Sequence, residues 1–425
     1  MEKEIKDLAE ECLNCINPTC IKGCPLKNNI PQFINYIKQN EEKKAWEELN
    51  KTTIYQSICG KICPHEKQCE GNCIKNKIGK PTKIGKIEEY LGNLAEKNKW
   101  YLEEENIEKI KENNKELINK KVAIIGSGPS GLTCSYWLAK NGIKVDIYEK
   151  DENPGGLLNH GIPDFRISKE KTNNIVERLK NLDVSVITNT EIEKDITIAE
   201  LLEKYDSIFI GIGANSSKRM NIEGENQDNV FFANELLENE NYPDFNDKII
   251  TVNGGGDVAL DMVRVAIRKK PKKVNLLYRR SENEMPAQKQ EIEQAKKEGV
   301  EFYYQTDLIK IENNKIECQK TKLIEDKNST RKVPVNIENS NFKLETDYLI
   351  EAIGSKPNKQ LIENFKKYIE TTDKDYIKVN ENYETSNPKI YAGGDIIGSN
   401  QTIATASRDG RKASKTIIEK LKSKD

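Results

Sequence analysis

The feature that most constrains the fold of this chain is a strand–glycine–helix pattern that occurs twice. In its first copy, the apolar run VAII leads into the loop GSGPSG and then into the helical stretch LTCSYWLAKNG. One glycine of such a loop makes the tight turn, the next lets the backbone approach a pyrophosphate, and the third lets the helix pack on the strand. We therefore expect a Rossmann-type, dinucleotide-binding unit that begins near residue 121.

The strand that follows this helix, VDIYEK, ends in an acidic residue. That residue, Glu149, lies 18 residues beyond Gly131, where an acid binds a free ribose hydroxyl pair. With strand, loop, helix, second strand and acid in register, the pattern is much more specific than a lone glycine motif. The candidate cofactor-binding residues of this unit are Gly126, Gly128, Pro129, Gly131, Glu149 and Lys150.

The second copy, IITVNGGGDVALDMVRVAI, carries an alanine at the third glycine position. Its next strand, VNLLYRR, ends in two arginines where the first unit has its glutamate. A carboxylate there would repel a 2′-phosphate, whereas guanidinium groups bind one, so this site favours NADP. Two ordinary surface arginines at a strand end are the alternative. The candidate residues are Gly254, Gly255, Gly256, Asp257, Arg279 and Arg280.

Eight of the ten cysteines lie within the first 73 residues, in CLNCINPTCIKGCP and CGKICPHEKQCEGNC. A disulfide framework suits small secreted domains, and structural zinc usually has paired CxxC half-sites, of which only one occurs here. Two iron–sulfur clusters need about eight soft ligands, and proline after a final cysteine is typical of ferredoxin-type runs. Cys24-Pro25 and Cys63-Pro64 have this feature, so clusters are favoured. Outside these runs, Cys134 is expected to be a small core residue.

The overall charge and the chain's first residues exclude several classes of function. A formal net charge of −1 gives no electrostatic reason to expect binding to nucleic acid or to an anionic membrane. The start, MEKEIKDLAEE, lacks the basic-then-apolar order of a secretory signal, and no apolar run approaches the roughly 18 residues of a membrane span. We expect a soluble, cytoplasmic protein.

Two C-terminal segments are expected to complete the first Rossmann unit. YLIEAIGSKPN reads as a strand that leads to a glycine turn, and IYAGGDIIGSNQTIATASRDGRKAS reads as a strand, a turn and a helix. An acid just after a strand, opposite a dinucleotide loop, can hydrogen-bond the ribityl or phosphate groups of a flavin. The motif GGD alone would be an ordinary turn. The candidates here are Gly394, Asp395 and Thr402.

In order along the chain, the motifs resemble the small subunit of bacterial NADPH-dependent glutamate synthase and its relatives. These relatives include the flavin subunit of NADH-dependent ferredoxin:NADP oxidoreductase and the N-terminal half of dihydropyrimidine dehydrogenase. The motifs are CLNCINPTCIKGCP, SICGKICPHEKQCEGNC, TKIGKIEEYL, VAIIGSGPSGL, GGLLNHGIPDFRI, GGGDVALD, YRRSENEMPA and SNPKIYAGGDI. The resemblance implies an α/β fold with a helical iron–sulfur domain (1–120), an FAD domain (121–230 and 346–425) and an NAD(P)H domain inserted within it (231–345).

The same resemblance implies FAD, NADPH and two [4Fe–4S] clusters, with ligands that interleave the two cysteine runs. Glu88 and Cys59 are rivals for the last ligand position, and an exposed helical glutamate is the alternative for Glu88. Gly156 and Leu157 would line the flavin, while His160 and His65 are expected to pack or to support rather than to react. One cluster would be held by Cys12, Cys15, Cys20 and Cys73, and the other by Cys24, Cys63, Cys69 and the last ligand.

The implied activity is an electron relay from NADPH through the flavin to the clusters. Hydride transfer depends on alignment of two rings, so no residue is expected to act as an acid or base catalyst. The electron acceptor would be a glutamate synthase large subunit or, alternatively, a ferredoxin or flavoprotein partner. A non-catalytic zinc scaffold with inactive Rossmann folds is a third, competing hypothesis.

Overall fold

The computed structural model describes residues 2–104, 107–326 and 331–423, which form two compact units. The first unit comprises Met1–Asn159, Asp164–Ala214 and Pro357–Asp425, and the second comprises His160–Pro163 and Asn215–Lys356. Both units contain a parallel sheet, and the first also contains the helical N-terminal region. The domain limits expected from the sequence stay predictions.

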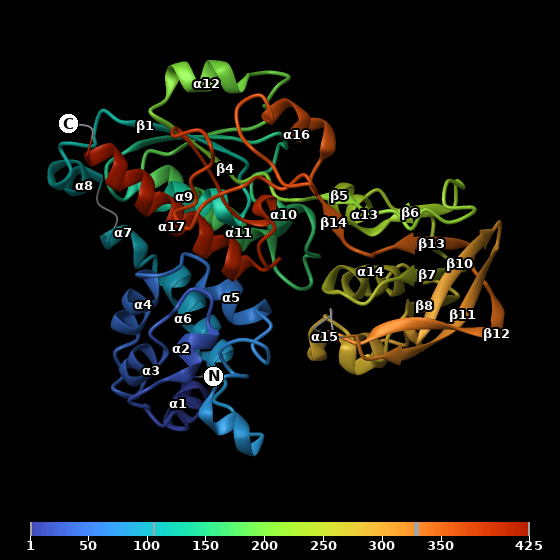
Figure 1. The fold of residues 1–425 in the computed structure, drawn as a ribbon. Helices are drawn as coiled ribbons and strands as arrows, with labels where there is room; N and C mark the ends of the chain where they lie inside the picture. The colour runs from blue at the N-terminus through green and yellow to red at the C-terminus, as the bar shows by residue number, and fades with distance from the viewer. Residues whose placement is uncertain (1, 105–106, 327–330, 424–425) are drawn as a thin grey trace. The chain divides into compact units, whose positions relative to one another are not determined.

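The N-terminal region is built from short helices packed against one another (Figure 1). Helix α3 buries Phe33, Ile34 and Ile37, and α6 buries Ile87 and Leu91, at the spacing of a helical stripe. The elements are α1 (Glu2–Glu10), α2 (Thr19–Gly23), α3 (Ile30–Lys38), α4 (Glu42–Asn50), α5 (Gln56–Ile62), η1 (Ile74–Ile78), α6 (Ile84–Asn98), α7 (Tyr101–Glu104) and α8 (Ile107–Asn113).

Glycines let helices α5 and α6 approach each other closely. A Cβ atom on Gly60 would stand 2.2 Å from the backbone nitrogen of Glu89, and one on Gly92 would stand 2.2 Å from the backbone nitrogen of Ser57. Neither position tolerates a side chain without a shift of backbone. This packing holds the cysteines of α5 against the buried face of α6.

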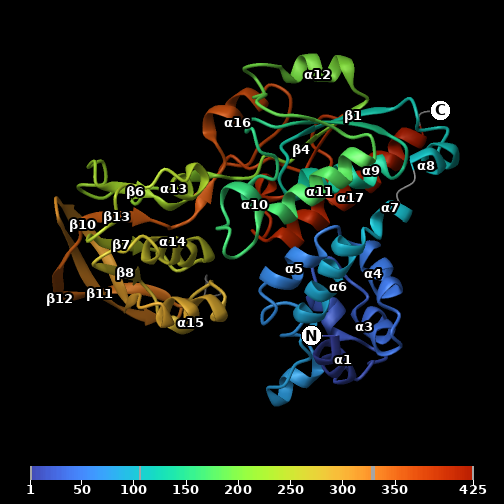
Figure 2. The ribbon, with the colours of Figure 1, turned by 180° about the vertical axis from the view of Figure 1, so that it is seen from behind.

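The first sheet has five parallel strands in the order β15-β4-β1-β2-β3. Helices α9 and α17 run side by side (Figures 1 and 2), because Gly410 of α17 has no side chain where a Cβ would stand 2.1 Å from the Ser130 carbonyl oxygen. The elements are β1 (Lys121–Ile125), α9 (Pro129–Ala139), β2 (Lys144–Tyr148), α10 (Leu157–His160), α11 (Lys169–Asn181), β3 (Ser185–Ile187), α12 (Ile198–Lys204), β4 (Ser207–Ile210), α16 (Lys359–Phe365), β15 (Ile390–Ala392), η3 (Asp395–Ile397) and α17 (Ile403–Lys422).

The second unit has a five-stranded parallel sheet, β6-β13-β7-β8-β9, a three-stranded antiparallel sheet, β10-β11-β12, and the short pair β14-β5. Its elements are β5 (Ser216–Ser217), β6 (Val230–Phe232), α13 (Ala233–Asn239), β7 (Ile249–Asn253), α14 (Asp257–Ile267), β8 (Lys273–Tyr278), η2 (Glu282–Glu284), α15 (Lys289–Lys297), β9 (Glu301–Tyr304), β10 (Thr306–Glu312), β11 (Lys315–Ile324), β12 (Val333–Glu345), β13 (Tyr348–Glu351) and β14 (Ser355–Lys356).

One prediction about the C-terminal segments is wrong. The strand of YLIEAIGSKPN, which is β13, pairs in parallel with β6 and β7 and so belongs to the second sheet, not to the first. Its buried apolar run fits either parallel sheet equally well, so the pattern alone does not identify its partner strands. The other segment does join the first sheet, where β15 pairs with β4.

Candidate functional site

The three glycines of the first loop have the three separate roles that nucleotide binding requires. Gly126 has φ +92°, and a Cβ there would stand 2.8 Å from the Gly211 carbonyl oxygen. A Cβ on Gly131 would stand 2.0 Å from the Gly126 carbonyl oxygen, so this glycine packs the helix on the loop. A Cβ on Gly128 would meet no atom closer than the Gly211 carbonyl oxygen at 3.8 Å, which leaves space for a ligand beside this backbone.

Glu149 is buried at the end of β2 and is bound to the same loop. Its Oε2 accepts hydrogen bonds from the backbone N–H of Ser127 at 2.9 Å and from the Ser127 hydroxyl at 2.5 Å. Its Oε1 accepts one from the backbone N–H of Asp151 at 3.0 Å. The structure therefore brings the predicted acid to the glycine loop, whereas Lys150 is exposed and lies 3.5 Å from Asp151.

The GGLL segment also lies against this loop. Gly156 has φ +54°, and a Cβ on it would stand 2.9 Å from the Cα atom of Gly128. Leu157 follows with 42% of its surface exposed. Gly156 therefore borders the first loop, and Leu157 comes next to it in the chain.

The GGD turn after β15 meets the first turn of α9. A Cβ on Gly394, which has φ +80°, would stand 2.8 Å from the Ser130 hydroxyl oxygen. Burial raises the pKa of Asp395 to about 6, and the nearby Asp409 carboxylate adds to the rise. Thr402 is the N-cap of α17, where its hydroxyl oxygen accepts a hydrogen bond from the backbone N–H of Thr405 at 3.1 Å.

The second loop repeats the same division of roles. A Cβ on Gly254, which has φ +155°, would stand 2.3 Å from the Ala352 carbonyl oxygen, and one on Gly255 would meet the Tyr278 ring at 2.4 Å. A Cβ on Gly256 would meet no atom within 4 Å, so there is room for a phosphate to approach its backbone. Asp257, the first residue of α14, accepts a hydrogen bond from the backbone N–H of Gln288 at 3.1 Å.

The predicted arginines lie at the end of β8, and a third arginine joins them. Arg279 is exposed, and Arg280 donates from Nε to the Lys332 carbonyl oxygen at 2.9 Å. The third, Arg331, was not predicted from the sequence, and its Nη2 donates to the Tyr278 hydroxyl at 2.9 Å. Arg331 is 53 residues from Tyr278 along the chain, so no local motif signals its position.

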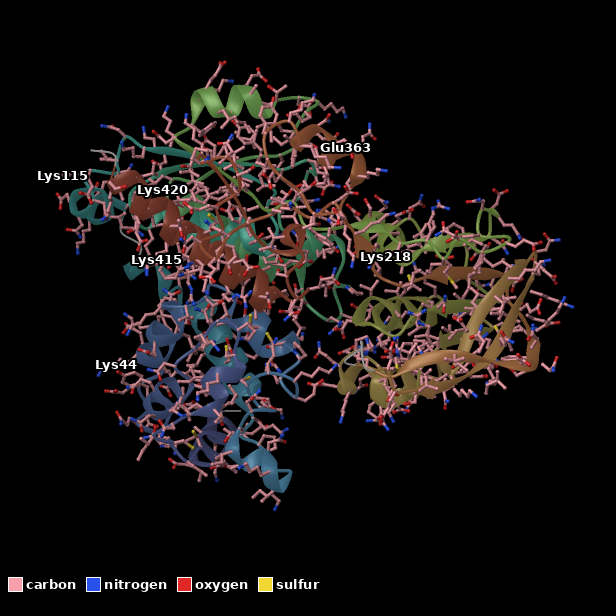
Figure 3. The ribbon with its side chains drawn as sticks, in the orientation of Figure 1. Lys44, Lys115, Lys218, Glu363, Lys415 and Lys420 are labelled. Carbon is pink, nitrogen blue, oxygen red and sulfur yellow. The ribbon has the colours of Figure 1, made fainter. Side chains whose placement is uncertain are left out.

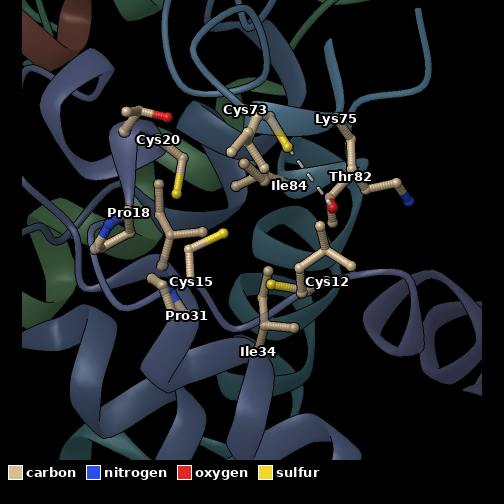
Figure 4. Close-up of a pocket in the computed structure, with 14 residues that line it drawn as sticks. Cys12, Cys15, Pro18, Cys20, Pro31, Ile34, Cys73, Lys75, Thr82 and Ile84 are labelled. Atoms are coloured by element: carbon tan, nitrogen blue, oxygen red, sulfur yellow. Dashed lines mark hydrogen bonds between the residues drawn. The ribbon is translucent and has the colours of Figure 1, made fainter. Parts of the chain in front are cut away.

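Four of the cysteines line one pocket in the helical region and form what we call the first thiol group: Cys12, Cys15, Cys20 and Cys73 (Figure 4). These are the four residues that the family resemblance assigns to one cluster. Burial raises the pKa of the Cys20 thiol to about 11, and the neighbouring Cys12 and Cys73 add to the rise. The Sγ atom of Cys73 lies 3.9 Å from the Thr82 hydroxyl oxygen.

The second thiol group consists of Cys24, Cys59, Cys63 and Cys69, all of them buried. Burial raises the pKa of Cys24 to about 12 and that of Cys69 well above the ordinary value. A hydrogen bond with the Cys59 side chain, together with burial, raises the pKa of Cys63 well above the ordinary value. The two rivals for the last ligand position, Cys59 and Glu88, are therefore both neighbours of the other predicted ligands.

Glu88 projects from α6 into the second thiol group. It is only 5% exposed, so the alternative of an exposed helical glutamate is wrong. Burial raises its pKa to about 8, and its charge raises the pKa values of all four thiols of the group. Its Oε1 accepts a hydrogen bond from Asn28 Nδ2 at 3.2 Å. The sequence signal for its burial was its place on the same stripe as Ile84, Ile87 and Leu91.

The donor atoms of both groups fit iron–sulfur chemistry, because clustered thiolates are the ligands that such clusters take. Across residues 2–104, 107–326 and 331–423, no three His, Cys, Asp or Glu side chains are spaced for a single metal ion. Cys134 is buried on α9, as expected for a core residue. Of the helices described, none is long and apolar enough to cross a membrane.

The second thiol group lies next to the first Rossmann layer. Arg411 of α17 donates to the carbonyl oxygens of Leu26 at 2.8 Å and Thr52 at 2.9 Å, close to Cys24. The Tyr55 hydroxyl, at the start of α5, donates to the Pro129 carbonyl oxygen in the first glycine loop at 3.3 Å. The pocket of the first thiol group, in contrast, is lined only by residues of the helical region.

The class of protein follows from the fold and the matches of its two parts. Residues 120–410 match the pyridine nucleotide-disulphide oxidoreductase family, and residues 1–100 match dihydropyrimidine dehydrogenase domain II, 4Fe-4S cluster. The solved structure of Mycobacterium tuberculosis FprA in complex with NADPH has a TM-score of 0.62 and 18% identity, over 71% of this chain and 84% of that one. The chain is thus a pyridine-nucleotide oxidoreductase with an iron–sulfur domain, and the predicted fold class is confirmed.

The particular family follows from the relatives. The glutamate synthase [NADPH] small chain of Escherichia coli (strain K12) is 32% identical over 98% of this chain and 91% of its own length. The NADPH-Fe(3+) oxidoreductase subunit beta of Geobacter sulfurreducens (strain PCA) is 34% identical over 81% of this chain and 52% of its own length. The chain belongs to the glutamate synthase small-chain family, which confirms the resemblance seen in its motifs.

Proposed function

We propose that this chain carries electrons from NADPH through FAD and two [4Fe–4S] clusters to a partner protein. The observation that carries the proposal is the grouping of the N-terminal ligands. Residues beside the second thiol group hydrogen-bond α17 and the first glycine loop, and the first thiol group lies in a pocket of the helical region alone. Two separate groups with nine candidate ligands support two clusters, one beside the flavin loop and one farther from it.

The residues of the chain bind and orient the groups that carry the electrons. When bound, FAD takes an electron pair from NADPH and the clusters pass it on one electron at a time. Gly128 and Gly256 leave room for the two pyrophosphates, and Glu149 holds the first loop in place. We propose that Arg279 and Arg280 bind the 2′-phosphate of NADPH and that Asp395 and Leu157 border the flavin.

We further propose that the partner is the large subunit of a glutamate synthase, in a reducing cytoplasm where the thiols stay available for iron. The small-chain relative that matches over nearly its whole length supports this assignment. A second candidate is transfer to another acceptor, because the Geobacter relative of similar identity is named as an NADPH-Fe(3+) oxidoreductase subunit.

The test is anaerobic purification of the full chain with its co-purifying polypeptide. We expect FAD, iron and acid-labile sulfide for two clusters, and NADPH oxidation that requires both glutamine and 2-oxoglutarate. Turnover with a ferredoxin or ferric iron, without a need for these two substrates, would support the second candidate. A preparation that holds neither flavin nor iron, and cannot be reconstituted with either, would refute the proposal.

A further inference from the structure

Exposed apolar side chains gather at the first thiol group. Among residues 2–100, the large hydrophobic residues that are exposed all lie in two short segments around this pocket, and Leu13 and Ile74 line the pocket itself. Single exposed apolar residues are ordinary, but a set confined to one site marks an interaction surface. We call this set the apolar rim: Leu13 (64% exposed), Ile16 (96%), Ile74 (48%) and Ile78 (72%).

The two segments that carry the rim are bound to each other. Lys75 Nζ donates to the carbonyl oxygen of Glu11 at 3.1 Å and to its carboxylate at 2.9 Å. The Thr19 hydroxyl donates to the Asn72 carbonyl oxygen at 2.5 Å. The rim is therefore one surface held in place by the fold and not two independent loops.

The segment of the rim that follows Cys73 is rich in lysine, and Lys75, which pairs with Glu11, is one of its lysines. The stretch from Cys73 to Lys86, CIKNKIGKPTKIGK, has five lysines and no acidic residue, although the whole chain has a net charge of only −1. Lys83 and Lys86 have weak ion pairs of 3.7 and 3.9 Å with Glu70 and Glu4. Two further lysines of the stretch, Lys77 and Lys80, are exposed beside Ile78 in the sequence.

We propose that the apolar rim and its lysines dock an acidic electron-acceptor protein, which takes electrons from the first thiol group. This inference rests on the proposed electron relay with its second candidate acceptor, a ferredoxin-type protein, and adds the site and the chemistry of the partner's face. An acceptor with acidic side chains around an apolar centre complements a basic rim around exposed isoleucines. An anionic membrane could bind the same charges, but a membrane would not explain why the rim encloses a thiol pocket.

The electron balance is simple. One NADPH gives up two electrons and releases one proton as it becomes NADP⁺. Two one-electron transfers across the docked face then reduce two equivalents of a one-electron acceptor, and no covalent bond forms between the proteins. The rim residues take no part in the chemistry, so their only contribution is to bind and orient the acceptor.

The test measures binding of the full, anaerobically prepared protein to an acidic bacterial ferredoxin. One variant combines Lys77→Glu with Lys80→Glu, and a second combines Ile16→Ser with Ile78→Ser. The matched charge control combines Lys115→Glu with Lys415→Glu. Both lysines are exposed and lie outside the two segments that carry the rim (Figure 3). Iron content, FAD content and NADPH–menadione turnover are measured for every variant, because they report on the cofactors and not on docking.

We expect the lysine variant to raise the dissociation constant for ferredoxin about tenfold at about 10 mM salt. The effect should be smaller near 0.3 M salt, because the distance over which charges interact is about five times shorter there. The isoleucine variant should raise it at both salt concentrations, and the control should change it less than about twofold. Iron, FAD and menadione turnover should not change in any of them.

Ferredoxin binding that is unaffected in both rim variants would overturn the inference while leaving the proposed function intact. So would a loss of binding to phosphatidylglycerol vesicles in the same variants without any change toward ferredoxin. If the charge reversal lowered iron content, the variant Lys77→Gln with Lys80→Gln would replace it, since it removes the positive charge without adding negative charge. Unchanged ferredoxin binding in this variant and in the isoleucine variant would overturn the inference. Absence of iron and flavin from the unmodified protein would instead refute the proposed function itself.

Discussion

The arginines at the end of β8 are the side chains that we propose distinguish NADPH from NADH. Arg279 is exposed. Arg280 donates a hydrogen bond to the Lys332 carbonyl oxygen, and Arg331 donates one to the Tyr278 hydroxyl at the end of β8. Guanidinium groups bind a phosphate with charge-assisted, often bidentate hydrogen bonds, and such a phosphate is present in NADPH but absent from NADH. We therefore expect these residues to contribute to the binding of NADPH and not to the binding of NADH.

Replacement of Arg279 and Arg280 by glutamine should raise the KM for NADPH by about tenfold or more and change that for NADH little. Steady-state oxidation of each nucleotide with menadione as acceptor measures both values. The variant Lys289→Gln, an exposed lysine on α15, is a control for a general loss of positive charge. Equal changes in the two KM values would contradict the assignment of a 2′-phosphate site.

The thiols make an equally local prediction about iron. Cys20→Ser should lower the iron content by about half, because one of the two proposed clusters would lose a ligand that its pocket cannot replace. FAD should remain bound, since no residue of the first glycine loop lines that pocket. Metal analysis and flavin absorbance measure both, with Cys134→Ala as the matched control in the core of α9. Unchanged iron in the serine variant would mean that Cys20 is not a ligand.

Among the elements, those with a repeating local pattern were predictable and those that depend on distant partners were not. The glycine loops were recognisable because turn, open backbone and helix packing each impose a residue type at a fixed spacing. The sheet to which β13 belongs could not be predicted, because a buried parallel strand has the same continuous apolar sequence in either sheet. Arg331 was also missed, because the β11–β12 hairpin that carries it meets β8 only after folding.

Strand β13 ends in a buried carboxyl group that makes the second unit sensitive to pH. Glu351 is only 3% exposed, and burial raises its pKa to about 8, with a further rise from the nearby Glu225. The folded protein therefore keeps this proton up to about pH 8, whereas the unfolded chain loses it near the ordinary glutamate value of about 4.3. Stability from this group is present at low pH and is lost as the pH rises toward 8.

We expect Glu351→Gln to remove this dependence, because glutamine resembles the protonated form at every pH. The difference in thermal unfolding midpoint between the variant and the original protein should be small at pH 5 and should favour the variant at pH 8. Calorimetry at both values checks it. A constant difference from pH 5 to pH 8 would show that Glu351 does not change its charge in this range.

The first unit as a whole depends on how its helical region is attached to its Rossmann layer, and Arg178 is central to that attachment. This arginine of α11 is 6% exposed, and its Nη2 donates to Asn50 Oδ1 of α4 at 2.8 Å and to the Tyr136 hydroxyl of α9 at 3.0 Å. Its guanidinium carbon also lies 5.8 Å from the ring centre of Trp46 and 5.6 Å from that of Tyr101. One cation therefore joins helices from both parts of the unit.

Arg178→Ala should lower the stability of the first unit by about 2–3 kcal/mol, because buried polar groups lose a charged partner and aromatic rings lose a cation. The neighbouring Lys180→Ala is the matched control, since Lys180 is exposed and pairs with Glu177 at 2.7 Å. Denaturation followed by circular dichroism and by release of the proposed flavin should show both signals shifting together for Arg178→Ala, because Arg178 joins α4 of the helical region to α9, the helix that follows the first glycine loop. If flavin release kept its original midpoint while the helical signal shifted, the two parts would be independent, and the path from flavin to clusters would not depend on Arg178.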